Sequence, residues 1–340
     1  MWKVVGPSPH CSQQKIDLDC NGLILVENKK PRAFDNLGSS CWINSAVQAL
    51  MTPMAFKRVL MASWEHLSAE SRQQVEYAAI TPRHQRETIP PSMTHQVRLS
   101  ATLSCAHLSP EWRPLLPHLF NDFFYENTQD DAAEFVRQVL HPDQLTSLSQ
   151  VLEGLMNPSR KCNNPACNSP PVPMNGEYVN PLSLPLRNGK RVSFTSVQEA
   201  VDAYMPDETV TLDEVCSCGV NCGYTKTNKV VVFPKVLVVF LNRWTGTGQK
   251  RSDAILQSIH ASPTLIFRGT FYRLCASVCH LGSSPNSGHY VTVARHPTEN
   301  GDWWLYDDTC CSRATPEQVA TMCKYKGWGA MQCYVLLYER

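Results

Sequence analysis

The sequence has no excess of charge of either sign, so it carries no general electrostatic attraction for another molecule. Its 340 residues include 31 lysines and arginines and 30 aspartates and glutamates, which leaves a formal net charge of +1. Proteins that bind nucleic acid or adhere to anionic membranes usually show a clear basic excess. We therefore expect no nucleic acid partner, and any partner held by charge must be held by a local group of residues.

The sequence also lacks an apolar run that would span a membrane, which needs roughly 18 apolar residues. The longest apolar segments, such as VLVVFL from Val236, are short and β-branched, and they predict buried strands. The opening segment MWKVVGPSPH has no apolar run of signal-peptide length, and Pro7 and Pro9 would interrupt one. We expect no membrane insertion and an intracellular location, in the cytoplasm and/or the nucleus.

The number of cysteines is not even, as complete pairing into disulfides would require. The chain has 15 cysteines and no secretion signal. This combination argues against a disulfide framework and favours a reducing compartment. Free thiols then serve as core residues, as metal ligands or as nucleophiles, and core packing is the default role.

The order of the predicted elements indicates the fold class. With 43% hydrophobic residues, the chain can build a sizeable core in one large domain or two to three subdomains. Helical spacing begins near Cys41 and stops before Pro53, and a second amphipathic helix, TQDDAAEFVRQVL, starts at Thr128. From Lys229 onward the chain is dominated by segments typical of strands. Helices followed by antiparallel strands predict an α+β fold.

Cys41 is the first candidate for chemistry. It follows the loop 36–40 and opens the predicted helix, which Ser39 or Ser40 can cap. Unpaired amides and the helix dipole at such a position favour a thiolate, the nucleophilic form of cysteine. A buried structural cysteine at a helix start gives the same local pattern, because cysteine is among the most buried residue types.

Two further residues fit the roles of a base and its orienting acid. His289 lies between a turn and the alternating strand YVTVAR, where an imidazole can reach a thiol and act as its base. Asp307 ends the aromatic segment WWLY 18 residues later, and a neighbouring strand would bring its carboxylate beside the imidazole. A surface turn histidine, and a pair of turn aspartates formed by Asp307 and Asp308, are the simpler interpretations.

Asn36 is a candidate donor to an oxyanion. It precedes Cys41 by five residues in the same loop. Its side-chain amide is neutral and can be held rigidly, and backbone amides at the helix start can supply a second donor. An asparagine in a turn has no such meaning by itself.

Five segments give these residues a common context: NLGSSCWINSAVQAL, TQDDAAEF, SGHYVTVAR, WWLYDD and YVLLYER, in this order. Together they resemble the ubiquitin-specific protease family, papain-like ubiquitin carboxyl-terminal hydrolases. That family has a Cys box N-x-G-x-x-C-[YW]-x-N-S-x-x-Q-x-L, a Gln/Asp box, a His box with G-H-Y, an aromatic-x-Asp/Asn-Asp segment and a closing Y-x-L-x-Y strand. The resemblance covers residues 34–340 and is weak between 61 and 120. Trp42 stands where the family often has tyrosine, and Ser39-Ser40 where it often has Asn-Thr.

The resemblance implies a role for each candidate residue. Cys41 matches the nucleophile, His289 the base and Asp307 the residue that orients the base. Asn36 matches the oxyanion donor. Asp308 matches a second acid that in some members supports the oxyanion site through water. The implied reaction is thiol-dependent hydrolysis at the C-terminal glycine of ubiquitin, through a thioester.

The resemblance also implies how the substrate is held. Asp131 matches the aspartate of the Gln/Asp box, which in the family pairs with the basic tail of ubiquitin, and a carboxylate there can meet an arginine bidentately. Ubiquitin and ubiquitinated proteins are the implied partners. The catalytic boxes do not report which modifier is cut, so a protease for another ubiquitin-like modifier is one alternative. A catalytically inactive ubiquitin-binding scaffold is the other.

The implied architecture is the right hand of ubiquitin-specific proteases. Residues 1–32 would form an N-terminal extension and residues 33–340 the catalytic domain. Within that domain we expect a thumb at about 33–145, fingers at about 146–230 and a palm at about 231–340.

Five cysteines in the middle of the chain indicate a structural zinc, and no catalytic cofactor is expected. A tetrahedral zinc site needs four thiolates on two knuckles, and the family's fingers often carry one. The usual two-residue spacing is absent, because CNNPAC and CSCGVNCGY space their cysteines differently. Glycine follows Cys218 and Cys222, as in a knuckle, so we expect the ligands Cys162, Cys167, Cys218 and Cys222, with Cys216 as the substitute. A decayed site with free thiols is the alternative.

Overall fold

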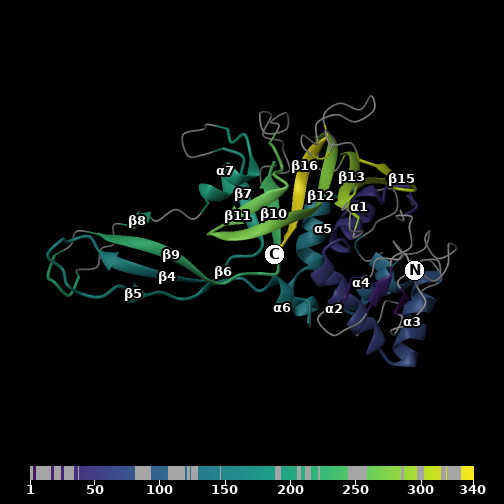
Figure 1. The fold of residues 1–340 in the computed structure, drawn as a ribbon, viewed down its shortest axis with the longest axis horizontal. Coiled ribbons are helices and arrows are strands. Elements are labelled where there is room, and N and C mark those ends of the chain that lie inside the picture. The colour runs from purple at the N-terminus through teal and green to yellow at the C-terminus, as the bar shows by residue number, and fades with distance from the viewer. Residues whose placement is uncertain are drawn as a thin grey trace.

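From Cys41 onward most helices precede the strands of the large sheet, as the sequence predicts (Figure 1). The computed structural model describes three short strands at 3–4, 17–18 and 24–26, and residues 34–36, 38–80, 93–105, 119–120, 123, 129–145, 147–187, 193–204, 208–210, 216–220, 223–243, 259–284, 287–296, 302–314, 319 and 331–340. A helical region packs on one face of a large sheet, and a long narrow sheet projects away from both. Among the described residues, no helix combines the length and the apolar character needed to cross a membrane.

The helical region is built around one central helix. Its elements are α1 (Cys41–Leu50), α2 (Met54–Glu65), α3 (Ala69–Ile80), α4 (His95–Cys105), α5 (Ala132–Val139) and α6 (Ser149–Leu152). Nine of the ten residues of α1 are buried, because α5 covers one side of this helix and the large sheet another. A helix with so little exposed surface belongs to the interior rather than to the surface of a domain. Trp42 of α1 meets the ring of Phe135 of α5 edge to face, with the centroids 5.7 Å apart.

The large sheet has eight strands in the order β15-β14-β13-β12-β16-β10-β7, with β11 paired to β12. Their bounds are β7 (Leu182–Pro185), β10 (Val236–Asn242), β11 (Thr264–Phe267), β12 (Thr270–Ser284), β13 (Ser287–Arg295), β14 (Trp303–Asp307), β15 (Cys310–Arg313) and β16 (Gln332–Glu339). All neighbours are antiparallel except β10 and β7. Every residue of β10 from Val236 to Leu241 is buried, and alternate side chains enter the helical core and the core on the opposite face. This explains why the segment is continuously apolar.

The projecting sheet contains the strands β4 (Leu155–Cys162), β5 (Val172–Pro173), β6 (Glu177–Tyr178), β8 (Glu208–Val210) and β9 (Tyr224–Val232). The long strands β4 and β9 pair antiparallel and run along the length of this sheet (Figure 1). Between them the chain returns to the large sheet, where it forms β7 and the short helix α7 (Val197–Asp202). The range 146–230 expected for the fingers thus also contains elements packed on the large sheet.

A three-stranded sheet in the order β1-β3-β2 lies near the N-terminus, with β1 (Lys3–Val4), β2 (Asp17–Leu18) and β3 (Ile24–Val26). It falls within the range 1–32 expected for an N-terminal extension.

A carboxylate of the large sheet caps a helix of the helical region. Pro53 occupies the N-cap position of α2 and offers no side-chain acceptor. Glu339, the last residue of β16, fills this role across the interface. Its two carboxylate oxygens accept hydrogen bonds from the backbone amides of Met54, at 3.1 Å, and Ala55, at 2.6 Å. These amides have no partner within the helix, so Glu339 satisfies them and also favours the positive end of the helix dipole.

We expect Glu339→Ala to lower the free energy of unfolding by about 1–2 kcal/mol, because two amides at the start of α2 lose their acceptor. Chemical denaturation of the purified chain measures this change. Glu134→Ala is the matched control: Glu134 lies on the exposed face of α5 in a surface pair with Arg137, so its loss should change the free energy by no more than about 0.5 kcal/mol. Equal losses in the two variants would show that Glu339 does not cap α2 in solution.

Candidate active site

Cys41 lies at the first turn of α1, with only 1% of its surface exposed. The preceding loop is fixed by Asn36, whose side-chain oxygen accepts a hydrogen bond from the Ser40 backbone amide at 3.1 Å. Gly38 within this loop has a φ of +102°, which favours glycine. Ser40 occupies the N-cap position without making a side-chain cap bond. The prediction that a serine hydroxyl caps this helix is therefore wrong for Ser40, and Asn36, four residues earlier, orders the loop instead.

His289 and Asp307 meet on neighbouring strands of the large sheet. The side-chain Nε2 of His289, on β13, lies 2.6 Å from Oδ1 of Asp307, at the end of β14. The other ring nitrogen, Nδ1, is therefore the one that can share the hydrogen bond between His289 and Cys41. Burial opposes the charged imidazole, but the hydrogen bonds to Asp307 and to Cys41 raise the pKa of His289 to about 10. A protonated imidazole at neutral pH stabilises a thiolate beside it and holds a proton for a leaving group.

Asp308 does not continue β14. Its φ of +47° turns the backbone away from the strand, and its carboxylate points to the loop before Cys41. Oδ2 accepts a hydrogen bond from the side chain of Asn36, and Oδ1 accepts one from Asn44 of α1, both at 2.8 Å. Burial raises the pKa of Asp308, and the two amide donors oppose this effect. The Asn36 amide is thus held at both ends, by Asp308 and by Ser40, and these contacts use one of its two N–H groups.

Asp131 is placed as the N-cap of α5. Its Oδ1 accepts a hydrogen bond from the Ala133 amide at 2.7 Å, and its Oδ2 accepts one from the Tyr334 hydroxyl at 2.7 Å. Burial raises the pKa of this carboxyl, against the opposing effect of these hydrogen bonds. Both oxygens therefore already accept hydrogen bonds from internal donors, and the Glu134 amide is a further one. These bonds fix the direction of the carboxylate at the start of the helix.

Gln129 is a site residue that the sequence reasoning did not single out. Its side-chain Nε2 lies 3.3 Å from Sγ of Cys41 and also donates to the backbone oxygen of Gly288. Its Oε1 accepts a hydrogen bond from the Gly288 amide at 2.9 Å. The only available signal was its position two residues before Asp131, in the segment TQDDAAEF that carries part of the family resemblance.

The arrangement is suited to acyl transfer. A thiol lies at a helix start, an imidazole serves it, a carboxylate orients the imidazole, and a rigid amide lies in the loop beside the thiol. These are the parts of a nucleophile activated by a base, with a donor for the oxyanion of a tetrahedral intermediate. The five residues expected to carry this chemistry, Cys41, His289, Asp307, Asn36 and Asp308, all lie at this one site.

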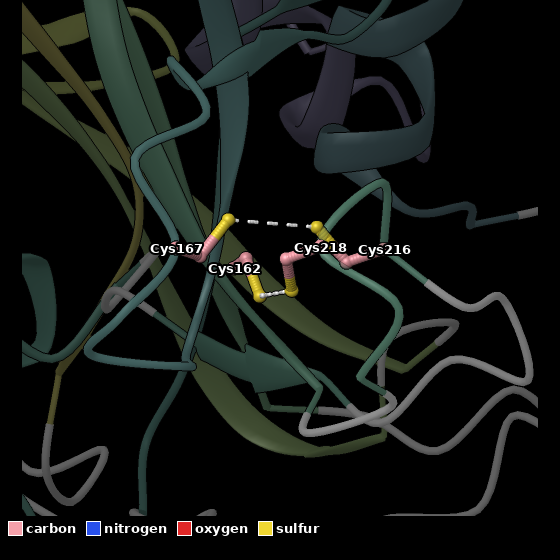
Figure 2. A group of neighbouring side chains, drawn as sticks. All are labelled: Cys162, Cys167, Cys216 and Cys218. Atoms are coloured by element: carbon pink, nitrogen blue, oxygen red, sulfur yellow. Dashed lines mark hydrogen bonds between the residues drawn. The ribbon is translucent and has the colours of Figure 1, made fainter.

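Four cysteines gather at the far end of the projecting sheet (Figure 2). They are Cys162, Cys167, Cys216 and Cys218, and their sulfur atoms all lie within 4.8 Å of one another. Cys216 thus takes part in the described cluster, while the expected ligand Cys222 lies outside the described residues.

The spacing of the sulfur atoms fits a zinc ion. A tetrahedral centre with Zn–S bonds of about 2.3 Å separates its sulfur atoms by about 3.8 Å. The pairs Cys162–Cys218 and Cys167–Cys216 lie 3.9 and 3.7 Å apart. The Cys218 amide lowers the pKa of the Cys216 thiol to about 6, and the Asn164 side chain lowers the pKa of Cys218. These four residues would hold a structural zinc, far from the reacting groups.

Comparison with known proteins gives a consistent result. A family model described as ubiquitin carboxyl-terminal hydrolase matches residues 32–338. The chain is 24% identical over 334 residues to ubiquitin carboxyl-terminal hydrolase 36 of Drosophila grimshawi, an alignment that covers 89% of this chain and 25% of that protein. It is 21% identical over 364 residues to ubiquitin carboxyl-terminal hydrolase 4 of Arabidopsis thaliana, which covers 92% of this chain and 94% of that protein. The Ubl carboxyl-terminal hydrolase 18 of Mus musculus is 24% identical over 297 residues, covering 81% and 76%.

The chain therefore spans about a quarter of the length of the fly relative. Among solved structures it is similar to a chain of the SAGA Ubp8/Sgf11/Sus1/Sgf73 DUB module bound to ubiquitin aldehyde, with a TM-score of 0.63 and 20% identity, covering 91% of this chain and 69% of that one. This likeness confirms the α+β fold class and the papain-like architecture predicted from the sequence.

The cysteine cluster generates a test of metal binding. We expect the purified chain to contain about one zinc ion, and expect Cys216→Ser to lose it, because a tetrahedral thiolate site needs all four ligands. Elemental analysis after dialysis measures the zinc content, and thermal unfolding with and without a chelator measures its contribution to stability. Cys310→Ser, an exposed cysteine outside the cluster, is the control and should keep its zinc. Loss of zinc in Cys222→Ser but not in Cys216→Ser would assign the fourth ligand to Cys222.

Proposed function

The chain belongs to the ubiquitin carboxyl-terminal hydrolase family, and on this premise we propose that it is a thiol-dependent deubiquitinase. It would hydrolyse the isopeptide or peptide bond at the C-terminal glycine of ubiquitin. The observation that carries the proposal is the hydrogen bond of 2.6 Å between His289 and Asp307 at the site that holds Cys41. An intact triad at one site distinguishes an enzyme from a binding scaffold that has lost its nucleophile or base.

The first half of the reaction forms a thioester. The Cys41 thiolate attacks the carbonyl carbon of the C-terminal glycine, and the carbonyl oxygen becomes an oxyanion. The remaining N–H of Asn36 and a backbone amide at the start of α1 donate hydrogen bonds to this oxyanion. Collapse of the intermediate breaks the bond to the lysine nitrogen, and the His289 imidazolium gives that nitrogen its proton.

The second half releases ubiquitin. His289, now neutral, accepts a proton from a water molecule, whose oxygen attacks the thioester carbonyl. The second tetrahedral intermediate expels the Cys41 thiolate and leaves a free carboxylate on ubiquitin. Asp307 holds the imidazole in one orientation through both halves and stabilises its charged form. Asp308 acts on the oxyanion side, because its two hydrogen bonds hold the amides of Asn36 and Asn44.

We propose that the helical region corresponds to a thumb at about 33–145, the projecting sheet to fingers within about 146–230, and the large sheet to a palm at about 231–340. Ubiquitin would lie against the fingers and palm, and its tail would pass between thumb and palm to reach Cys41. Ubiquitinated proteins are the proposed substrates. An intracellular location, in the cytoplasm and/or the nucleus, is proposed on the basis of the cysteines, of which the described ones form no disulfide.

The decisive measurement is a reaction with ubiquitin that carries an electrophile at its C-terminus. We expect a covalent adduct with the chain and none with Cys41→Ala, because the adduct needs the nucleophile. The same electrophile on other ubiquitin-like proteins is the specificity control. An adduct with another modifier alone would retain the mechanism and replace the substrate. No adduct with any modifier, from a folded chain, would favour the binding scaffold.

Asp131 is proposed to contact a basic residue in the tail of ubiquitin. A carboxylate has about four acceptor positions. Its internal donors, Ala133, Glu134 and Tyr334, leave room for an N–H of an arginine without loss of the N-cap. We expect Asp131→Asn to raise KM for a ubiquitin substrate by about tenfold or more and to change kcat little, because a charge-assisted contact is lost while the shape remains.

Steady-state kinetics with a fluorogenic ubiquitin substrate measure this effect. Asp130→Asn is the matched control, since Asp130 is the exposed acid next to Asp131 and is assigned no contact with the tail. A similar change of KM in both variants would show a general charge effect. A fall of kcat alone in Asp131→Asn would assign the residue to the fold of the site.

A further inference from the structure

We propose that Gln129 is a positioning residue that holds His289 against Cys41 across the interface between the helical region and the large sheet. The proposal rests on the proposed function, since it concerns the same nucleophile and base. It adds a residue that acts on the reacting thiol directly and on the imidazole through the backbone.

The first part of the argument is the double contact between Gln129 and Gly288. The Gln129 side chain accepts from the Gly288 amide at 2.9 Å and donates to the Gly288 backbone oxygen. Both backbone groups of one residue are thus bound by one side-chain amide, as a neighbouring strand would bind them. His289 follows Gly288 directly in the chain. The backbone that carries the imidazole is therefore held against the helical region.

The position of Gly288 is one that only glycine fits. Its φ is +134°, a conformation that favours glycine. A Cβ at this position would lie 2.2 Å from the backbone oxygen of Leu281 and 2.8 Å from Nε2 of His280. His280 is itself buried, with its ring against that of Tyr290 at a centroid distance of 4.6 Å. Glycine is therefore required where this backbone passes close to strand β12 and binds Gln129.

The second contact of Gln129 is with the nucleophile. Its Nε2 lies 3.3 Å from Sγ of Cys41. The amide group has two N–H bonds and one oxygen, and the contacts to Cys41 and Gly288 use all three. This pattern also fixes the orientation of the amide, because a reversed amide would place its oxygen against the oxygen of Gly288. A hydrogen-bond donor at the sulfur atom favours the thiolate over the thiol.

Gln129 is itself held in place by the start of α5. Two residues later, Asp131 caps this helix and accepts a hydrogen bond from Tyr334 of β16 at 2.7 Å. The backbone that carries Gln129 is thus tied to the same sheet that carries His289. A rigid support of this kind is what a residue needs in order to hold two reacting groups in a fixed geometry.

The experiment uses the full chain with Gln129→Glu and Gln129→Ala. Gln129→Glu keeps the size and the acceptor for the Gly288 amide but removes both N–H donors and adds a negative charge near the thiol. Gln138→Glu and Gln138→Ala are the matched controls, because Gln138 lies on the exposed face of α5 and its side-chain nitrogen donates to Glu134 at 3.1 Å. The rate of alkylation of Cys41 by iodoacetamide, measured on its own peptide by mass spectrometry, is recorded against pH, together with kcat and KM for a fluorogenic ubiquitin substrate.

We expect the pH of half-maximal alkylation of Cys41 to rise by about one unit or more in Gln129→Glu, since a donor to the thiolate is replaced by a repelling charge. Gln129→Ala should show a smaller rise. In both variants kcat should fall by about tenfold or more with little change in KM, and the Gln138 variants should match the unaltered chain. A purely structural role would leave the pH profile of the folded fraction unchanged.

Three results would overturn the proposal: an unchanged alkylation profile in both Gln129 variants, a change confined to KM, or a faster turnover in Gln129→Ala. The last would mean that the amide obstructs the cleft. The expected shift in alkylation, found in a chain that forms no adduct with ubiquitin, would support the role of Gln129 and overturn the proposed function.

Discussion

The interface between the helical region and the large sheet is the constraint on which the site depends. The nucleophile is on one side of it and the base on the other, so neither body alone can perform the reaction. Hydrophobic packing brings the two bodies together but does not set their register, because it is not directional. Hydrogen bonds supply the direction: Thr292 donates to the backbone oxygen of Ser45 at 2.6 Å, Asn44 donates to Asp308, and Glu339 accepts from α2. Each bond joins one body to the other within a few residues of a reacting group or at a helix start.

Helix α1 carries polar side chains into this buried interface. The amide nitrogen of Asn44 and the hydroxyl of Ser45 have specific partners there. Trp42 Nε1, Asn44 Oδ1 and Gln48 Oε1, in contrast, have none among the described residues. Asn44 donates to the backbone oxygen of Asp35 as well as to Asp308, and the Ser45 hydroxyl donates to the oxygen of Trp42. A buried polar group without a partner is destabilising, so such groups disfavour any arrangement that leaves them unpaired. The hydrogen bonds of α1 therefore fix its rotation about its own axis and its position along the sheet, and with them the position of the thiol.

The sequence was sufficient to predict much of this site. Cys41, His289 and Asp307 could be found because each stands at the end of a local pattern, a helix start or a strand end, that the chain displays without its partners. Gln129 could not, because its role exists only where it meets a backbone 159 residues away. The cysteine cluster shows the same limit: glycine after Cys222 favoured that residue, which lies outside the described residues, and local spacing gave no reason for the sulfur of Cys216 to lie 3.7 Å from that of Cys167. Local spacing identifies which residues can act, and the three-dimensional arrangement determines which of them meet.

The continuously apolar strand β10 has a consequence for how the protein becomes inactivated on unfolding, rather than for its chemistry. In the native fold β7 and β16 flank it and two cores cover its faces. Once the sheet opens, the same VLVVFL segment has high β propensity, no charge and no proline, which is the composition of segments that associate between chains. Unfolded molecules would then aggregate faster than they refold. The lifetime of the active protein at a given temperature would be set by the rate at which the sheet opens, and not by an equilibrium between folded and unfolded chains.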